Sequence, residues 1–207
     1  MNALETTRLI IRPFTMDDLE AVHQLLDLDL HWSGDGISIE QRWEKLQLQV
    51  SLAQWTTTDC LYGDRAIVLK ESEQLTGICG FRPWLCSPQE RCLYQLPESP
   101  EPSFHSLELG VGYALSSQHR GQGYATEAVK ALLEYGFTRL RVGRIVALTD
   151  RGNTSSVNVM RRVGMQIGVN PDPEALYPWV FGIIENPAHR CAGDEIRTAN
   201  IIPRSNT

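Results

Sequence analysis

The feature that most constrains the fold is a strand that runs into a glycine loop and then into a helix. Alternating apolar residues predict the strand over residues 107–115, and apolar residues at helical spacing predict the helix from Gly123 to about Thr138. Gly121 and Gly123 let backbone N–H groups approach a ligand closely, and the positive end of the helix dipole lies at the same place. The segment therefore predicts an anion site for a phosphate or pyrophosphate. The alternative is a tight turn that binds no ligand.

The spacing of these glycines excludes two common phosphate-binding motifs. Thr126 stands where a dinucleotide-binding fingerprint that begins at Gly121 has its third glycine. The chain also contains no G-x-x-x-x-G-K-[ST] motif, which excludes a P-loop. A different class of anion site is needed to explain the loop.

The remaining pattern predicts one domain with an α+β (mixed α/β) fold. Six further segments have the composition of strands: residues 8–12, 65–70, 75–81, 144–149, 166–169 and 178–185. Three further segments have helical spacing: residues 15–30, 38–53 and 154–163. Strands that come first and then alternate with helices are typical of this class. We expect the domain to cover residues 1–185, followed by a tail, residues 186–207, that lacks periodicity.

A proline-rich insertion is predicted at residues 82–105. It holds five of the chain's eleven prolines and has no strand or helix periodicity. Loops of this length inside a compact domain are usually functional, interfacial or disordered. The alternatives are a segment that covers the substrate, a contact with the second subunit of a homodimer, and surface disorder.

Composition and charge exclude several classes of protein. The net charge of −6 argues against a nucleic-acid binder, whose footprint is a basic patch. No run approaches the roughly 18 apolar residues of a membrane helix. Residues 1–5 do not resemble a secretory signal, so we expect a cytoplasmic protein without a membrane partner. Five cysteines at irregular spacing indicate reduced thiols, and Cys86 and Cys92 with His105 lack a C-x-x-C pair, so we predict no metal site.

Four motifs stand out along the chain: residues 7–14 (TRLIIRPF), residues 112–115 (GYAL), Arg120-x-x-Gly123-x-Ala125, and residues 153–156 (NTSS) followed by residues 162–165 (RVGM). Together they resemble the GNAT superfamily of acetyl-CoA-dependent N-acetyltransferases, in that family's order. The third is similar to the pyrophosphate signature R/Q-x-x-G-x-G/A. The others are similar to T-x-R-L-x-L-R-P, G-Y-x-L and N-x-x-S…G-F/M of the Rim-type branch, whose founding members acetylate ribosomal-protein N-termini. The resemblance covers about residues 4–185.

The resemblance implies a GNAT fold: a central, mostly antiparallel seven-stranded sheet flanked by helices, whose fourth and fifth strands (residues 107–115 and 144–149) splay apart. It also implies acetyl-CoA as co-substrate, with the pantetheine arm between those strands and the pyrophosphate on the N–H groups of residues 120–125. Ordinary helix capping is the alternative role for Asn153 and Ser156. The implied cofactor-binding residues are Ala114, Leu115, Arg120, Gly121, Gln122, Gly123, Tyr124, Ala125, Asn153 and Ser156.

By the same resemblance, a primary amine attacks acetyl-CoA directly in a ternary complex, and the candidate catalytic residues are Glu108, Asn153 and Ser156. The amine must lose a proton, so a base is needed. Glu108 shares a strand face with Ala114 and is the candidate base, although relatives often carry the acidic residue at the position of Gly110. An exposed strand glutamate is the alternative. The helix after residue 153 lacks the tyrosine that many relatives use as the acid, so Asn153, Ser156 or water would stabilise the CoA thiolate.

The acceptor site is expected around His31, Trp32 and Asp35, with residues 172–179, because these regions surround the acceptor in the family. A solvated loop histidine and a tryptophan packed on the core are the alternatives. The acceptor is a protein N-terminus or a small-molecule amine. Residues 108–165 carry eight basic and four acidic side chains in an otherwise acidic chain, which suits an anionic cofactor. A non-catalytic acyl-CoA sensor and a scaffold module of the same fold are the alternative functions.

Overall fold

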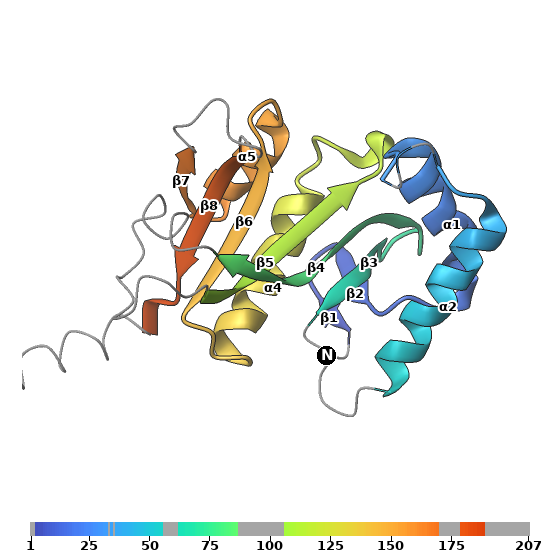
Figure 1. Cartoon of the computed structure of the whole chain (residues 1–207), viewed down its shortest axis with the longest axis horizontal. Coiled ribbons are helices and arrows are strands. Elements are labelled where there is room, and N and C mark those ends of the chain that lie inside the picture. Colours follow the sequence, from blue (N-terminus) through green and yellow to red (C-terminus); the bar gives the residue numbers. More distant parts are fainter. Residues whose placement is uncertain are drawn as a thin grey trace, which may run out of the picture.

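The fold is built on one eight-stranded sheet (Figure 1). The computed structural model describes residues 3–32, 34, 36–55, 62–86, 106–169 and 179–188. Adjacent strands are antiparallel except for β5 and β6, which are parallel. The strands lie in the order β1-β2-β3-β4-β5-β6-β8-β7, with the bounds β1 Leu4–Glu5, β2 Leu9–Arg12, β3 Gly63–Leu69, β4 Leu75–Cys86, β5 Ser106–Leu115, β6 Arg144–Asp150, β7 Gln166–Val169 and β8 Trp179–Glu185.

The predicted mixed, mostly antiparallel fold is confirmed, with one strand more than the seven expected. The additional strand is β1, where Leu4 pairs with Ile11 and Glu5 with Ile10. A strand of two residues is too short to show an alternating pattern, so its pairing with β2 in three dimensions is what reveals it.

Helices cover both faces of the sheet (Figure 1), because alternate residues of the central strands are apolar on both sides. Ala66 and Val68 of β3 pack with α1 and α2, whereas Ile67 packs on the other face with α4 and α5. The four predicted helices are confirmed. They are α1 Leu19–His23, which begins with a 3-10 turn (Met16–Asp18) and continues as a π-helical segment (Gln24–Asp29), α2 Ile39–Trp55, α4 Tyr124–Thr138 and α5 Thr154–Arg162.

Strands β5 and β6 separate toward their C-terminal ends (Figure 1). They pair at Leu109 with Ile145 and at Gly110 with Val146, and the described residues show no pairing between them beyond these positions. Because β5 runs on to Leu115, its C-terminal half presents backbone groups to this side without a partner strand. The predicted splay of these two strands is confirmed.

The predicted start of the proline-rich insertion is wrong by five residues. Strand β4 continues through Cys86 and pairs with the first residues of β5, so residues 82–86 belong to the sheet. Pro83 conceals this in the sequence, since proline cannot donate to a ladder. Strand β3 begins only at Gly63, which pairs with Phe81, so among the described residues Pro83 has no partner on the β3 side, and such a strand edge tolerates proline. The rest of the insertion, residues 87–105, lies outside the described residues.

The predicted boundary between domain and tail also moves. Asn186, placed in the tail by sequence, is buried. Its backbone N–H donates to the Gly143 carbonyl at 2.8 Å, and its side-chain amide donates to the carbonyl groups of Phe137 and Val142 at 3.2 and 3.1 Å. Asn186 therefore closes the turn between α4 and β6 and belongs to the domain. Residues 189–207 lie outside the described part of the chain.

The described residues also show the state of two cysteines, the character of the helices and the placement of metal-ligating side chains. Cys79 and Cys86 are buried thiols without a disulfide, and burial raises the pKa of Cys79, whereas Cys60, Cys92 and Cys191 lie outside the described residues. None of the helices in the described ranges is long and apolar enough to cross a membrane. Over the same ranges, no group of three His, Cys, Asp or Glu side chains is placed to hold a metal ion.

The Asp18 carboxylate stabilises the reversal between β2 and α1. It accepts hydrogen bonds from the Arg12 guanidinium at 2.7 and 2.8 Å and from the Thr15 N–H at 2.7 Å. Burial works to raise the pKa of Asp18, but the hydrogen bonds from Arg12 and Thr15 outweigh it. The pKa of Asp18 therefore lies below its ordinary value.

Asp18→Asn should lower the free energy of unfolding by about 2 kcal/mol at neutral pH, because the charge-assisted hydrogen bonds are lost. Since the folded-state pKa is lowered, this stabilisation is fully present above the unfolded-state pKa of about 3.9 and is lost as the pH falls through the folded value. Chemical denaturation near neutral pH and near pH 3 should show a difference from wild type that shrinks in acid. Asp17→Asn, at the exposed neighbouring position, is the control; equal losses in both variants would contradict the expectation.

Candidate active site

A cavity of about 500 Å³ lies where β5 and β6 separate. Three segments of the chain and the residues after the π-helical segment enclose it. Its lining consists of Tyr113, Ala114 and Leu115 from β5; Arg120, Gly121, Gly123, Ala125 and Thr126 from the glycine loop and the start of α4; Asn153, Ser155, Ser156, Asn158, Val159 and Arg162 from α5 and its cap; and Leu30 and Trp32.

The glycine loop presents its backbone to this cavity. Gly121 and Gly123 have φ angles of 77° and 84°, in the left-handed region that favours glycine. Gly123 is the N-cap of α4, and the N–H groups of a first helical turn have no intrahelical partners. Arg120 fixes the beginning of the loop, because its Nε donates to the Leu115 carbonyl at 3.2 Å. The loop is thus complementary to an anion, as the sequence predicts.

The other wall of the cavity is the first turn of α5. Asn153 caps this helix, since its Oδ1 accepts the Ser156 N–H at 3.1 Å. The Ser156 carbonyl in turn accepts the Tyr113 hydroxyl at 3.0 Å, which joins α5 to β5 across the splay. Burial raises the pKa of Tyr113 to about 12, so this hydroxyl stays protonated and can donate at neutral pH. Asn153 and Ser156 therefore form the cap and line the cavity as well.

Sequence reasoning missed several polar residues of the cavity. Asn158 and Arg162 lie three and seven positions after Ser155, so they share its helix face, and this periodicity was the available signal. The Thr126 hydroxyl is buried and has no hydrogen-bond partner among the residues that the structure describes. Buried polar atoms are normally hydrogen-bonded, so an unpartnered hydroxyl beside a cavity points to a polar group of a ligand.

Glu108, the predicted base, lies at the closed end of the splay and does not line the cavity. It is 7% exposed. Its two carboxylate oxygens accept hydrogen bonds from Nε and Nη2 of Arg144 at 3.0 and 2.7 Å. This ion pair joins β5 to β6 next to the residues at which the two strands pair. The role of Glu108 as base stays a prediction, and its contacts give it a structural role besides.

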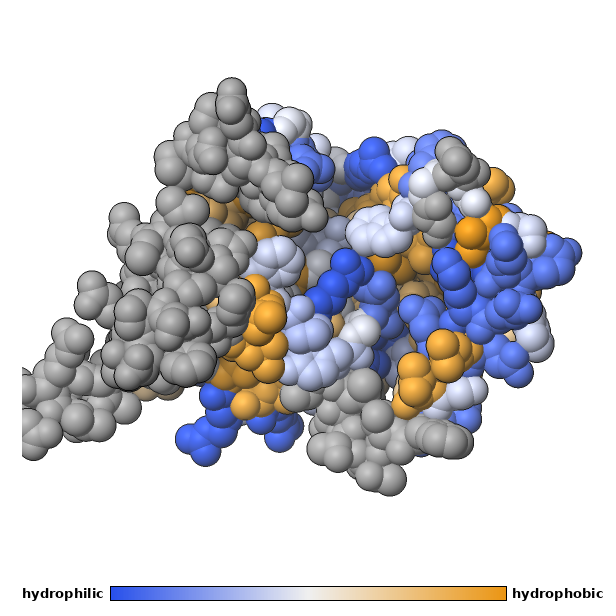
Figure 2. Space-filling model, viewed as in Figure 1, coloured by the Kyte–Doolittle hydropathy of each residue, from blue (hydrophilic) through white to orange (hydrophobic). Residues whose placement is uncertain are grey.

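On the face seen in Figure 2, hydrophilic side chains cover much of the α1–α2 side and occupy the hollow in the middle. Trp32 lines the cavity, and the Arg82 guanidinium lies 5.4 Å from the centre of its ring. Arg82 also donates to Asp64 at 2.6 Å. His31 is exposed and is not part of the lining, and its φ of 48° marks a sharp turn. Asp35 lies outside the described residues.

Two of the predicted cofactor residues face away from the cavity. Gln122 is exposed, and its side-chain amide donates to the Gln118 carbonyl at 3.2 Å. Tyr124, the first residue of α4, stacks beneath the Arg8 guanidinium at 4.5 Å. Neither residue is part of the lining, although their neighbours Gly121, Gly123 and Ala125 are.

Comparison with known proteins identifies the class of protein. A model of the family described as "Acetyltransferase (GNAT) domain" matches residues 8–166, which is well over half of the chain. The chain belongs to the GNAT family, and it is an N-acetyltransferase.

Two curated relatives and one solved structure illustrate the similarity. The uncharacterized N-acetyltransferase p20 of Bacillus licheniformis is 26% identical over 80% of this chain and 83% of its own. The uncharacterized protein YkkB of Bacillus subtilis (strain 168) is 38% identical, but the match covers 32% of this chain and 38% of that protein. RimL, a ribosomal L7/L12 α-N-protein acetyltransferase solved in complex with coenzyme A, has the same fold: TM-score 0.62 at 20% identity, over 89% of this chain and 98% of RimL.

Proposed function

We propose that this N-acetyltransferase takes its acetyl group from acetyl-CoA bound in the cavity between β5, α4 and α5. The pyrophosphate lies on the N–H groups of residues 120–125, and the pantetheine arm runs along the unpaired edge of β5. The observation that carries the proposal is that one cavity joins the left-handed glycine loop to this open strand edge. The Arg162 guanidinium and the Thr126 hydroxyl, which has no partner within the described ranges, line the same cavity and suit a polar, anionic ligand.

The chemistry follows from what surrounds the open end of β5. The amine nitrogen forms a bond to the acetyl carbon, the carbon–sulfur bond breaks, and the proton that the nitrogen loses passes to a base, directly or through a water, and from there to the CoA thiolate. Backbone N–H groups near Ala114 and Leu115 stabilise the oxyanion of the tetrahedral intermediate. The CoA thiolate leaves beside Asn153 and Ser156, whose side chains can donate hydrogen bonds to it, and it takes up its proton through water. A thiol of pKa near 8.5 is a tolerable leaving group, so positioning carries much of the rate enhancement.

The acceptor enters on the side of Trp32, at the opposite wall from α5. Trp32 is half-exposed and lies between the cavity and the Arg82–Asp64 ion pair, so it can contact both the thioester end and the acceptor. The acceptor is a primary amine, either a protein N-terminus, as in the ribosomal-protein acetyltransferase RimL, or a small molecule. A homodimer, a cytoplasmic location and a reaction without metal stay predictions from the sequence.

Calorimetric titration with CoA and a thiol-release assay on a panel of amines test this function together. We expect one CoA per chain and release of free thiol with at least one class among N-terminal peptides, polyamines, aminoglycosides and amino acids. CoA at a hundred times its Kd should raise the unfolding free energy by about 2.7 kcal/mol. Absence of any CoA-dependent stabilisation would contradict the proposed cofactor. Tight CoA binding without thiol release from any amine would favour an acyl-CoA sensor.

A further inference from the structure

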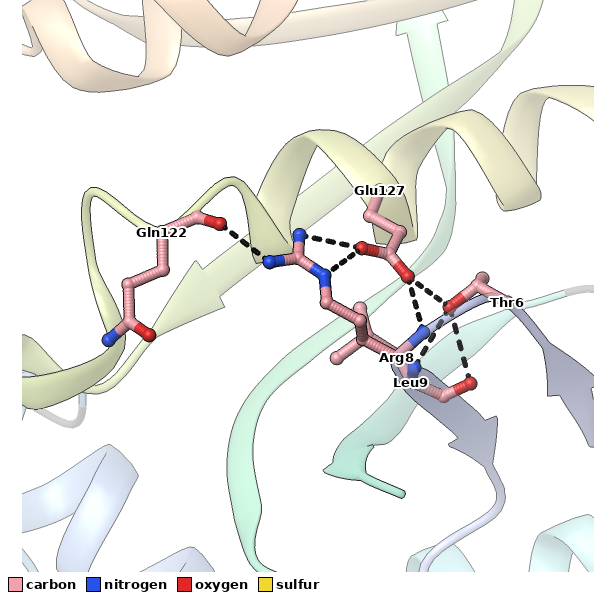
Figure 3. Close-up of polar contacts among 5 residues, drawn as sticks. All are labelled: Thr6, Arg8, Leu9, Gln122 and Glu127. Carbon is pink, nitrogen blue, oxygen red and sulfur yellow. Dashed lines mark hydrogen bonds and ion pairs between the residues drawn. The ribbon is translucent and has the colours of Figure 1, made fainter. Parts of the chain in front are cut away.

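The segment just before β2 is attached to the first turn of α4 by a cluster of polar contacts (Figure 3). Nε and Nη2 of Arg8 both lie 2.7 Å from Oε2 of Glu127, and the Arg8 N–H donates to Oε1 at 2.8 Å. The Thr6 hydroxyl also donates to Oε1, at 2.6 Å. Arg8 and Glu127 are 119 positions apart, so the sheet is what brings them together. We call these three residues the Arg8–Glu127 clamp.

The clamp also contacts the glycine loop. Nη1 of Arg8 donates to the backbone carbonyl of Gln122 at 3.0 Å (Figure 3). In a trans peptide unit the carbonyl and the following N–H point in opposite directions. A Gln122 carbonyl held toward Arg8 therefore turns the Gly123 N–H away from Arg8, and Gly123 lines the cavity.

Arg8 itself takes no part in the lining of the cavity. Its guanidinium lies over the Tyr124 ring, on the outer side of the loop. A Cβ atom at Gly123 would come within 3.4 Å of Nη2 of Arg8, so loop and guanidinium are in close contact. Arg8 accordingly acts on a ligand in the cavity without lining it, through the loop backbone and through its charge.

The charges in the clamp are balanced in a way that suits an anion nearby. A carboxylate in the first turn of α4 interacts favourably with the helix dipole. Without a counter-charge, however, the same carboxylate would repel a pyrophosphate bound nearby. Burial works to raise the pKa of Glu127, but the hydrogen bonds from Thr6 and Arg8 outweigh it, so the pKa lies below its ordinary value and Glu127 is ionised at neutral pH. The Arg8 guanidinium neutralises this charge.

We propose that Arg8 and Glu127 are positioning residues for the donor substrate: the clamp orients the Gln122–Gly123 peptide so that its N–H faces the CoA pyrophosphate. The inference rests on the proposed function of the cavity. It also gives a reason for the spacing of Thr6 and Arg8, because both side chains reach Glu127. Glu127 completes the clamp from the helix that carries the glycine loop.

The test compares the affinities for CoA and for pantetheine, which ends before the pyrophosphate. Arg8→Ala should raise the Kd of CoA about tenfold, because an oriented charge-assisted contact is lost, and leave the Kd of pantetheine essentially unchanged. Arg8→Lys keeps the charge but lacks the planar guanidinium, so its Kd for CoA should lie between those of wild type and Arg8→Ala. In steady-state kinetics the KM for acetyl-CoA should rise while the KM for the amine stays constant.

Lys70→Gln is the matched control, because it removes an exposed ion pair with Glu5 (2.9 Å) beside the same sheet edge but has no contact with the loop. It should leave both affinities unchanged. Wild-type protein that binds no CoA would overturn the proposed cavity function rather than the clamp. An Arg8→Ala variant that binds CoA as wild type does would overturn the clamp. Equal losses of CoA and pantetheine affinity in Arg8→Ala would also overturn the clamp. If Arg8→Ala does not fold, Arg8→Lys supplies the same comparison.

Discussion

Gly123→Val should raise the Kd of CoA about a hundredfold while the protein remains folded, because two N–H contacts to an anion are worth about this much. Gly123 has a φ of 84°, which a β-branched residue adopts at high cost. The new side chain would also press on Nη2 of Arg8, 3.4 Å from the Cβ position. The loop must then change its conformation, and its N–H groups no longer converge on the cavity. Titration calorimetry with CoA measures the change.

Gly164→Val is the matched control for this prediction. Gly164 follows α5 with a φ of 89°, so the substitution imposes a similar backbone strain outside the cavity. Both variants should lose comparable stability in thermal denaturation, but Gly164→Val should keep most of its CoA affinity. If Gly123→Val binds CoA as wild type does, the pyrophosphate is not held by the glycine loop.

Glu108→Gln should lower the free energy of unfolding by about 3 kcal/mol, because it leaves the largely buried Arg144 guanidinium without its counter-charge. The pair lies where β5 and β6 meet, so its loss weakens the closed end of the splay. Replacing both Glu108 and Arg144 with Met should restore stability to within about 1 kcal/mol of wild type, since both charges of the ion pair are then removed together. Urea denaturation of wild type, Glu108→Gln and the double Met variant measures these differences. A Glu108→Gln variant as stable as wild type would contradict the prediction.

The same variant decides whether Glu108 is also the base. If Glu108 accepts the amine proton, the pH optimum of Glu108→Gln should rise, because the reaction then depends on amine that is already neutral. The pH dependence of the activity is measured on folded enzyme below its denaturation temperature, with Glu5→Gln at an exposed position as the control. An unaltered pH profile together with the loss of stability would leave Glu108 as a structural residue and remove it from the mechanism.

Much of the fold could be predicted because it depends on near neighbours in the sequence. The helix that begins after Gly123, the strand over 107–115 and the α5 cap at Asn153 are each specified by periodicity and turn chemistry within a few residues. The errors occur where this local signal fails. Strand β1 is too short to alternate, and Pro83 looks like a strand end although β4 continues to Cys86. Asn186 has no local signal, because its partners come from the turn after α4.

The site divides in the same way. The glycine loop and its helix could be assigned to an anion from the sequence, because backbone conformation at Gly121 and Gly123 is a local property. Thr126 and Arg162 could not be assigned to the cavity from the sequence, since a helix presents several faces and packing selects which one is buried. For Glu108, the sequence offers no signal for its partner, because Arg144 comes from the neighbouring strand.

By itself, then, the sequence determined the order of the elements, the conformation of the glycine loop and the family to which the chain belongs. The tertiary structure decided which side chains meet: Arg8 with Glu127 across 119 positions, Glu108 with Arg144, and Trp32 with Arg82. The physical reason is that turns and periodic segments are set by neighbours a few residues away, whereas these contacts depend on the order and register of the strands. Only once the sheet is assembled does an arginine just before β2 lie against the loop before α4.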